Sequence, residues 1–207
     1  LKGNLNNSVI IGSGIIGKDV EVSGDPLVIH MVRGPLTRQK LLKRNIYCPD
    51  LYGDPALIMP KLYQPQNKKG KKYKIGFIPH YVDISHPLTK KLINKFDLHF
   101  IDIQDDIERV VKEVNCCETI VSSSLHGLII SDAYGIPNKW IKISDKVKGN
   151  GFKFYDYFNS VGRIEHALDL NNLKNFSEIK NLIPEQNQAC FDIDSLYSTI
   201  KNCIYTL

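Results

Sequence analysis

The segment ETIVSSSLHGLIISDAYGIPNKWIKI, residues 118–143, carries the pattern from which we predict the fold class. It opens with the short apolar run ETIVSS, which is typical of a buried strand. LHGLIISDAY follows with the length of a helix, and Gly135 and Pro137 beyond it are helix stop signals. NKWIKI then has the composition of a second strand. Strand, helix and strand in this order predict a βαβ unit with parallel strands.

The same alternation precedes this segment in the chain. YKIGFIPHY and LHFIDI are predicted strands, and HPLTKKLINKF and DDIERVVKEV are predicted helices. Together they predict a Rossmann-like half with a parallel sheet from about Tyr73 to Ile143. Ligands of such sheets bind outside the carboxyl ends of the strands, which is where IPHY and SSSLHG would lie.

A second, shorter alternation lies nearer the N-terminus. SVIIGSGII and PLVIHMV are predicted strands, and GPLTRQKLLKRNI is a predicted helix with Pro35 in its first turn. The composition turns polar through QPQNKKGKK, and we place a domain junction there. The predicted organisation is a partial N-terminal Rossmann-like half (1–64), a linker (65–73), a C-terminal Rossmann-like half (74–165) and a helical tail (166–207). DIDSLYSTIKNCIY is the clearest helix of that tail.

Composition and charge narrow the class of protein. The 207 residues are 43% apolar and 24% charged, as in soluble globular proteins. No apolar run approaches the ~20 residues that span a bilayer. Lys and Arg number 27 and Asp and Glu number 22, so the net charge is only +5. The basic run NKKGKK lacks interleaved aromatic residues, so we interpret it as a solvated linker and expect no nucleic-acid partner.

The cysteines favour a reducing compartment. They are five, an odd number, and none forms a C-x-x-C pair with another. We therefore expect neither a disulfide framework nor a zinc site, and we predict a cytoplasmic protein. The sequence begins at Leu1, which leaves a preceding signal sequence open.

The predicted turn from strand to helix at SSSLHG has the features of an anion site. A serine among Ser122, Ser123 and Ser124 is expected to cap the helix, with the N–H groups of the first turn directed into a binding cleft. Hydroxyls, N–H groups and the positive end of the helix dipole together suit a phosphate or a carboxylate. The pattern alone also fits a plain helix cap, and His126 alone also fits a buried, hydrogen-bonded histidine.

Four segments taken together carry a family resemblance. They are VRGPLTRQKLLKRNI, YGDPALIMP, SSSLHGLIISDAYGIP and GNGFKFYDYFNSVGR, which occur in this order between Val32 and Arg163. Their order and content resemble the polysaccharide pyruvyltransferase family. Many members carry an arginine where this chain has Ser124, so another residue would supply that cation or the donor would be held differently.

The resemblance implies a fold and an activity. The fold would be two Rossmann-like halves facing across a cleft, as in B-type glycosyltransferases. The N-terminal half is expected to be incomplete, because the family's usual first strand and glycine-rich turn do not precede Leu1. The activity would be transfer of an enolpyruvyl group from phosphoenolpyruvate to a sugar as a ketal, in exopolysaccharide or capsule synthesis, without a metal or other cofactor. The acceptor would be a sugar or a lipid-linked oligosaccharide, which suggests a cytoplasmic enzyme with peripheral association at the inner face of the membrane.

Several residues then receive expected roles. His126 would deliver a proton to the methylene carbon of the donor, because the pKa of a histidine lies near ~6.5, or it would donate a hydrogen bond to the donor phosphate. His80, at the end of a predicted strand, is a second catalytic candidate or a structural histidine. Arg33 would bind a carboxylate or phosphate through its planar fork, and Lys153 would either replace the cation missing at Ser124 or be a surface lysine. The other expected donor-binding residues are Ser122, Ser123, Ser124 and Gly127.

Two other function classes stay open. A nucleotide-sugar-dependent glycosyltransferase would have the same architecture and would also hold phosphate at a helix start. No acidic pair is placed to hold a nucleotide ribose or its metal, which favours the pyruvyltransferase. A non-catalytic sugar-binding relative is the third class, because Ser124 stands where many members have arginine.

Overall fold

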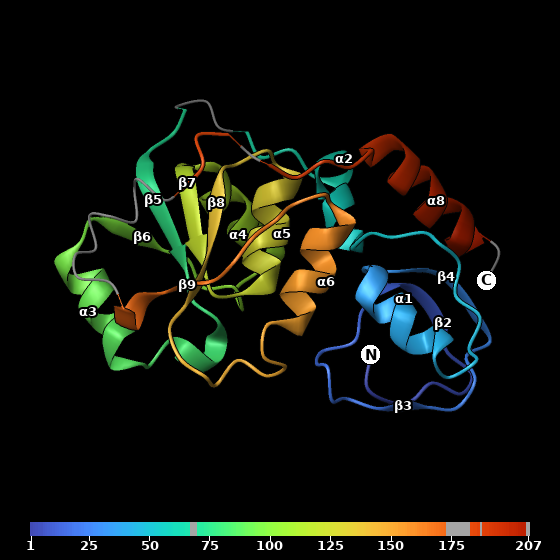
Figure 1. Cartoon of the computed structure of the whole chain (residues 1–207). Helices are drawn as coiled ribbons and strands as arrows, with labels where there is room; N and C mark the ends of the chain where they lie inside the picture. The colour runs from blue at the N-terminus through green and yellow to red at the C-terminus, as the bar shows by residue number, and fades with distance from the viewer. Residues whose placement is uncertain (67–69, 173–182, 187, 206–207) are drawn as a thin grey trace. The chain divides into compact units, whose positions relative to one another are not determined.

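The computed structural model describes residues 1–66, 70–172, 183–186 and 188–205, which form two compact units (Figure 1). Unit 1 comprises Leu1–Ile58, Lys148–Glu165 and Ala189–Leu207, and unit 2 comprises Met59–Val147 and His166–Gln188. Unit 1 thus includes residues 148–165, which the sequence pattern assigned to the C-terminal half, and residues 189–207, which it assigned to the tail. Parts of the predicted linker (67–69) and tail (173–182, 187, 206–207) lie outside the described residues.

Unit 2 is built on a five-stranded sheet in the order β6-β5-β7-β8-β9. The strands are β5 (Tyr73–Ile78), β6 (Leu98–Phe100), β7 (Cys117–Ser122), β8 (Asn138–Lys142) and β9 (Leu168–Asp169). Every neighbouring pair is parallel, so the predicted parallel sheet between Tyr73 and Ile143 is confirmed. This mixed α/β unit with parallel strands is compatible with a Rossmann-like fold.

Helices cover both faces of this sheet. They are α3 (Pro87–Lys95), α4 (Ile107–Asn115) and α5 (Leu125–Ala133), with the short α2 (Met59–Leu62), η2 (Tyr81–Asp83) and η3 (Leu170–Asn172). Because successive strand residues face opposite sides, Ile78 packs in one cluster with Val110 and Ile130 of α4 and α5. Phe77 packs in another cluster with Leu92 of α3. The apolar core therefore lies on both sides of the sheet and holds the carboxyl ends of β5 and β7 in place.

Unit 1 contains two small parallel sheets in its described part. In one, β2 (Val9–Ser13) pairs with β4 (Val28–Val32), and a parallel bridge joins Val32 to Tyr52. In the other, β1 (Gly3–Asn4) pairs with β3 (Val22–Ser23). Its helices are α1 (Pro35–Leu42), η1 (Pro55–Ile58), α6 (Phe152–Ser160) and α8 (Ile193–Tyr205). The helix predicted over 192–205 is thereby confirmed.

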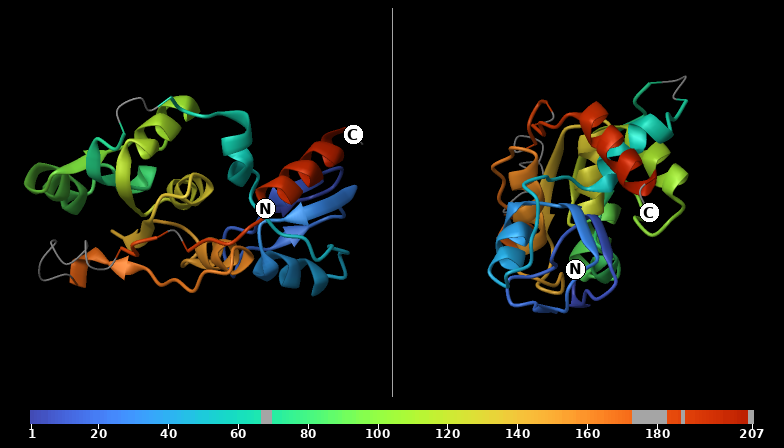
Figure 2. Two further views of the ribbon diagram at one scale, coloured as in Figure 1. Left: turned by 90° about the horizontal axis from the view of Figure 1, so that it is seen from above. Right: turned by 90° about the vertical axis from the view of Figure 1, so that its right-hand side faces the viewer.

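Contacts between distant segments hold unit 1 together. Helix α6 packs against α1, and α8 packs against η1. Figure 2 shows α8 beside the strands of this unit in both views. Leu196 of α8 is buried, and a Cβ at Gly53 would lie only 2.8 Å from its side chain. None of the described helices combines the length and the apolar composition that a membrane span requires.

Candidate functional site

The turn between β7 and α5 is organised by the hydroxyl of Ser122. This side chain is 0% exposed, and its Oγ accepts a hydrogen bond from the N–H of Ser124 at 3.0 Å. The same Oγ lies 2.9 Å from the carbonyl oxygens of Ile78 and Ser124, to which it can donate. Ser124 occupies the N-cap position of α5, but its side chain makes no capping hydrogen bond, which corrects our expectation of a serine hydroxyl cap. Ser122 therefore shapes the turn from a buried position.

A second serine joins the ends of β5 and β7. The backbone N–H of His80 donates to Oγ of Ser123 at 2.8 Å, and the N–H of Ser123 donates to the carbonyl of Ile78 at 3.1 Å. The imidazole of His80 is half-buried, and its Nδ1 accepts from the N–H of Val82 at 3.4 Å, where η2 begins. A neutral imidazole that accepts at Nδ1 carries its proton on Nε2. His80 is thus held at the carboxyl edge of the sheet, where the sequence predicted it.

His126 is the exposed residue of this turn. Ser122, Ser123, Ser124 and the first helical residue, Leu125, are buried, whereas the side chain of His126 is exposed. The imidazole is therefore not part of the core, which removes the buried-histidine alternative. The first N–H groups of an α-helix have no partner within the helix and carry its positive dipole end. His126 accordingly combines a titratable side chain with the positive end of α5.

Gly127 is required by the packing of α5 on the sheet. A Cβ at this position would lie 2.5 Å from Oγ of Ser122 and 3.0 Å from Cγ2 of Ile78. Both distances are shorter than ordinary van der Waals contacts. The absence of a side chain therefore lets the start of α5 approach the end of β5.

Unit 1 holds Arg33 as a buried cation just after β4. The residue is 7% exposed, and its Nη2 donates to Oδ2 of Asp156 at 3.0 Å and to the carbonyl of Ile15 at 2.8 Å. Its buried Nε has no hydrogen-bond partner among the described residues. A Cβ at Gly14 would lie 2.3 Å from Cζ of Arg33, so this glycine makes room for the guanidinium.

Asp156 fixes this arginine from α6. Its carboxylate is 0% exposed and also accepts from the N–H of Thr37 at 2.9 Å and from the Thr37 hydroxyl at 2.7 Å. Oγ1 of Thr37 in turn accepts from the N–H of Ile15 at 2.9 Å. We did not single out Asp156 or Thr37 from the sequence, although both lie in segments that carry the family resemblance. The pattern offers no signal that distinguishes them from surface residues.

Lys153 lies near Arg33 in the same unit. Burial lowers the pKa of its ammonium group, and the positive charge of Arg33 lowers it further. In the part of the chain that the structure describes, no carboxylate forms an ion pair with Lys153. Arg33 and Lys153 thus interact electrostatically in unit 1, where the buried carboxylate of Asp156 pairs with Arg33.

Two further polar side chains have structural roles. Oδ1 of Asp54 accepts from the N–H of Ala56 at 3.0 Å, which is a side-chain hydrogen bond typical of turns. His86 caps α3, since its Nδ1 accepts from the N–H of Leu88 at 3.2 Å. Across the described ranges, no three His, Cys, Asp or Glu side chains gather as metal ligands would.

The predicted residues therefore form one group within each unit. His80, His126, Gly127 and the three serines lie at the ends of the adjacent strands β5 and β7 of unit 2. Arg33 and Lys153 lie together in unit 1.

Comparison with known proteins identifies a family that this chain matches. A family model described as polysaccharide pyruvyl transferase matches residues 21–145, which is more than half of the chain. The matched range contains Arg33, His80 and the turn at 122–127, and it ends before Lys153. No solved structure matches the chain.

Two relatives show how much of a longer protein the chain resembles. An uncharacterized protein of Acanthamoeba polyphaga mimivirus is 32% identical over 193 residues, covering 84% of this chain and 65% of the relative. The succinoglycan biosynthesis protein ExoV of Rhizobium meliloti (strain 1021) is 31% identical over 159 residues, covering 75% of this chain and 48% of the relative. The chain thus spans between about half and two thirds of the length of these relatives.

Proposed function

Since the chain belongs to the polysaccharide pyruvyl transferase family, we propose that it transfers the enolpyruvyl group of phosphoenolpyruvate to a sugar of a surface polysaccharide. The product would be a pyruvate ketal. The exposed His126 at the start of α5 is the observation that carries this proposal. The name of the Rhizobium relative, a succinoglycan biosynthesis protein, supports a polysaccharide as the product. The acceptor would be a sugar or a lipid-linked oligosaccharide, modified at the cytoplasmic face of a membrane.

The proposed chemistry balances without a cofactor. A proton added to the methylene carbon of the donor produces a methyl group and a cationic carbon beside the phosphate oxygen. One sugar hydroxyl adds to that carbon and loses its proton, inorganic phosphate leaves, and a second hydroxyl adds and loses its proton. The two hydroxyl protons balance the one that is added to carbon and the one that leaves on inorganic phosphate. The chain must therefore deliver a proton to carbon, accept two from the hydroxyls, and protonate and stabilise the leaving phosphate.

His126 supplies the first proton in this scheme. Its imidazole is exposed at the start of α5 and is therefore accessible to a donor bound there. The N–H groups at the start of α5 hold the phosphate oxygens. Ser122 and Ser123, which are buried and bonded to the main chain, set the shape of this turn.

His80 and the cations of unit 1 take supporting roles. The imidazole of His80 accepts at Nδ1, so we assign to it the donation of an Nε2 proton in a hydrogen bond to a substrate oxygen. Arg33 and Lys153 bind an anionic group of a substrate, because the unpaired Nε of Arg33 is a donor and a bound anion would offset the burial of Lys153.

The donor is tested by thermal unfolding with phosphoenolpyruvate, nucleotide sugars and simple sugars. A ligand that binds only the folded chain raises its melting temperature. We expect phosphoenolpyruvate to do so. Stabilisation by a nucleotide sugar alone would instead indicate a glycosyltransferase, and stabilisation by a simple sugar alone would indicate a non-catalytic relative.

Catalysis is tested with His126→Gln. We expect this variant to retain the melting temperature, because the side chain is exposed. It should retain donor binding but lose turnover by about 10²–10⁴, the usual effect of removing a general acid. The measurement is phosphate release at saturating phosphoenolpyruvate with a competent acceptor, and His30→Gln on β4 is the matched control. Normal turnover in His126→Gln would refute the assigned role.

A further inference from the structure

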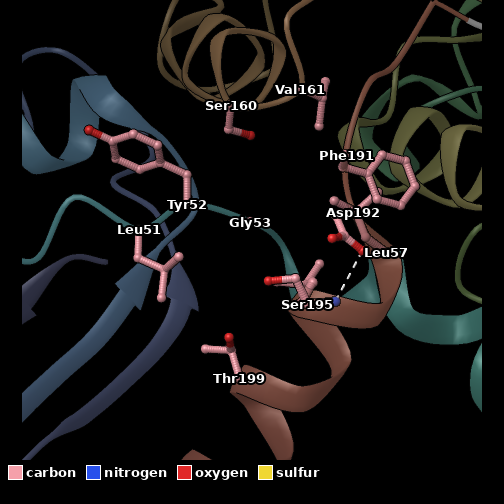
Figure 3. A pocket seen from close by; sticks show the side chains of 11 residues that line it. Leu51, Tyr52, Gly53, Leu57, Ser160, Val161, Phe191, Asp192, Ser195 and Thr199 are labelled. Atoms are coloured by element: carbon pink, nitrogen blue, oxygen red, sulfur yellow. Dashed lines mark hydrogen bonds between the residues drawn. The ribbon is translucent and has the colours of Figure 1, made fainter.

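A small pocket is lined only by residues of unit 1 (Figure 3). Its volume is about 200 Å³. It is lined by the segment after the bridge to β4, by η1, by the end of α6 and by the start of α8, through Leu51, Tyr52, Gly53, Leu57, Ser160, Val161, Phe191, Asp192, Ser195, Leu196 and Thr199.

Hydroxyl groups face this pocket from two helices. Ser195 and Thr199 of α8 direct their hydroxyls toward the space beside Leu51 and Tyr52 (Figure 3). In the described part of the chain, neither hydroxyl is committed to a hydrogen bond within the protein. Ser160 donates to the carbonyl of Tyr157 at 2.7 Å, which leaves the lone pairs of its oxygen as acceptors. A ligand thus meets two hydroxyls that can donate or accept and one that accepts.

A carboxylate completes the polar side of the pocket. Oδ1 of Asp192 accepts from the N–H groups of Asp194 and Ser195 at 3.0 and 3.1 Å, so it caps α8. Its second oxygen makes no further hydrogen bond in the described structure and can accept from a ligand. Among the described residues no Lys or Arg lines the pocket, so an anionic ligand would meet only a negative charge there.

Apolar side chains also line the pocket. Leu51, Leu57 and Leu196 contribute aliphatic surface, and Phe191 contributes an aromatic ring. The hydroxyl of Tyr52 points away (Figure 3), and burial together with a hydrogen bond to Asp50 raises the pKa of Tyr52 to about 12. Its ring, not its hydroxyl, therefore borders the cavity. A lining that mixes apolar side chains with hydroxyls and one carboxylate suits a neutral polyol ring, which has both C–H and O–H surfaces.

Size and location specify the ligand further. Pockets for drug-sized ligands measure roughly 300–1,000 Å³, so this one has room for a single sugar ring and not for a nucleotide.

Ser160 lies one helical turn, about 6 Å, after Asp156 on α6, and Asp156 holds Arg33. Tyr52 bridges Val32, the residue before Arg33. Two lining residues therefore lie close, along the chain or across a bridge, to the residues of the Arg33–Asp156 ion pair.

We infer that this pocket binds one neutral sugar ring, and that this ring belongs to the acceptor. Its identification as an acceptor site rests on the proposed function. The sugar-binding site itself rests on the pocket alone.

The test uses methyl glucoside, methyl galactoside and methyl mannoside as neutral probes and glucuronate as an anionic one, in amide chemical-shift titrations of the whole chain. We expect a neutral probe to shift the resonances of Ser160, Ser195 and Thr199. The double variant Ser195→Ala/Thr199→Val should weaken that binding about tenfold or more, since it removes two hydrogen bonds. Ser198→Ala, an exposed serine of α8 outside the pocket, should bind as the parent does.

The inference would be overturned by the absence of any shift at the pocket with every neutral sugar, or by equal binding to the parent and the double variant. Tighter binding of glucuronate than of the neutral sugars would also contradict it. Phosphoenolpyruvate binding, measured on the same variants, separates this result from the proposed function. If phosphoenolpyruvate binds but no sugar binds the pocket, only this inference fails. If a sugar binds the pocket but phosphoenolpyruvate does not bind the chain, the sugar site stands and the proposed transferase activity is refuted.

Discussion

Asp156 is the residue that allows a guanidinium to be buried in unit 1. We expect Asp156→Ala to lower the free energy of unfolding by about 3–5 kcal/mol, because it leaves the charge of Arg33 buried without its partner. Asp156→Asn should lower the free energy of unfolding by less, since its amide can keep part of the hydrogen bonding to Thr37. Denaturant unfolding provides the measurement, with the exposed Asp19→Ala as control. A loss below about 1 kcal/mol in Asp156→Ala would show that Arg33 is solvated in the native protein.

Lys153 makes a pH-dependent contribution of predictable sign. Burial and the charge of Arg33 lower the pKa of Lys153 in the folded chain below its ordinary value of 10.5. At a pH between the folded-state pKa and 10.5, the folded chain therefore binds fewer protons than the unfolded chain. Its charged form therefore opposes folding fully below the depressed pKa, and this cost disappears as pH rises toward 10.5. We expect Lys153→Met to be more stable than the parent at neutral pH, with a difference that narrows at alkaline pH. Paired unfolding curves across that range measure it, and a difference independent of pH would contradict the prediction.

Helix α5 is placed by the absence of a side chain at its third residue. At an exposed helix position, Gly→Ala stabilises a protein by roughly 1 kcal/mol. At Gly127 we expect the opposite sign, a loss of about 1–3 kcal/mol, because the new methyl would overlap Ser122 and Ile78. Thermal unfolding of Gly127→Ala and of the parent would measure this loss. The double variant Ser122→Ala/Gly127→Ala should lose less than the two single losses combined, because removal of the Ser122 hydroxyl relieves the closest contact.

At the scale of the whole molecule, unit 1 depends on the C-terminal helix. Leu196, Ile200 and Cys203 of α8 are buried, and Leu196 packs on Gly53. Truncation after residue 188 should therefore reduce the hydrogen-exchange protection of β2 and β4 while β5 and β7 keep theirs. Equal protection of β2 and β4 in the parent and the truncated chain would show that α8 is dispensable.

Local pattern was sufficient for the strands and helices between Tyr73 and Ile143, but it predicted a helical tail from residue 166, where β9 (Leu168–Asp169) instead pairs with β8. The alternation of apolar strands with helix-length segments depends on neighbours within about ten residues, so 118–143 alone predicts strand, turn, helix and strand in their observed order. The same reasoning placed His80 and SSSLHG at the carboxyl edge of the sheet. The same reasoning did not predict the roles of the serine hydroxyls, because a run of three serines does not show which side chains will be buried and which will form a helix cap.

Only the tertiary structure decided which segments share a core and which charges are paired. Arg33 and Asp156 are 123 positions apart, and their ion pair forms because α6 packs against α1. Residues 148–165 and 189–207 join unit 1 for the same reason, since their apolar faces are buried by segments far away in the chain. Periodicity shows that a helix has an apolar face, but the surface that covers this face is chosen by long-range packing, which no local pattern encodes.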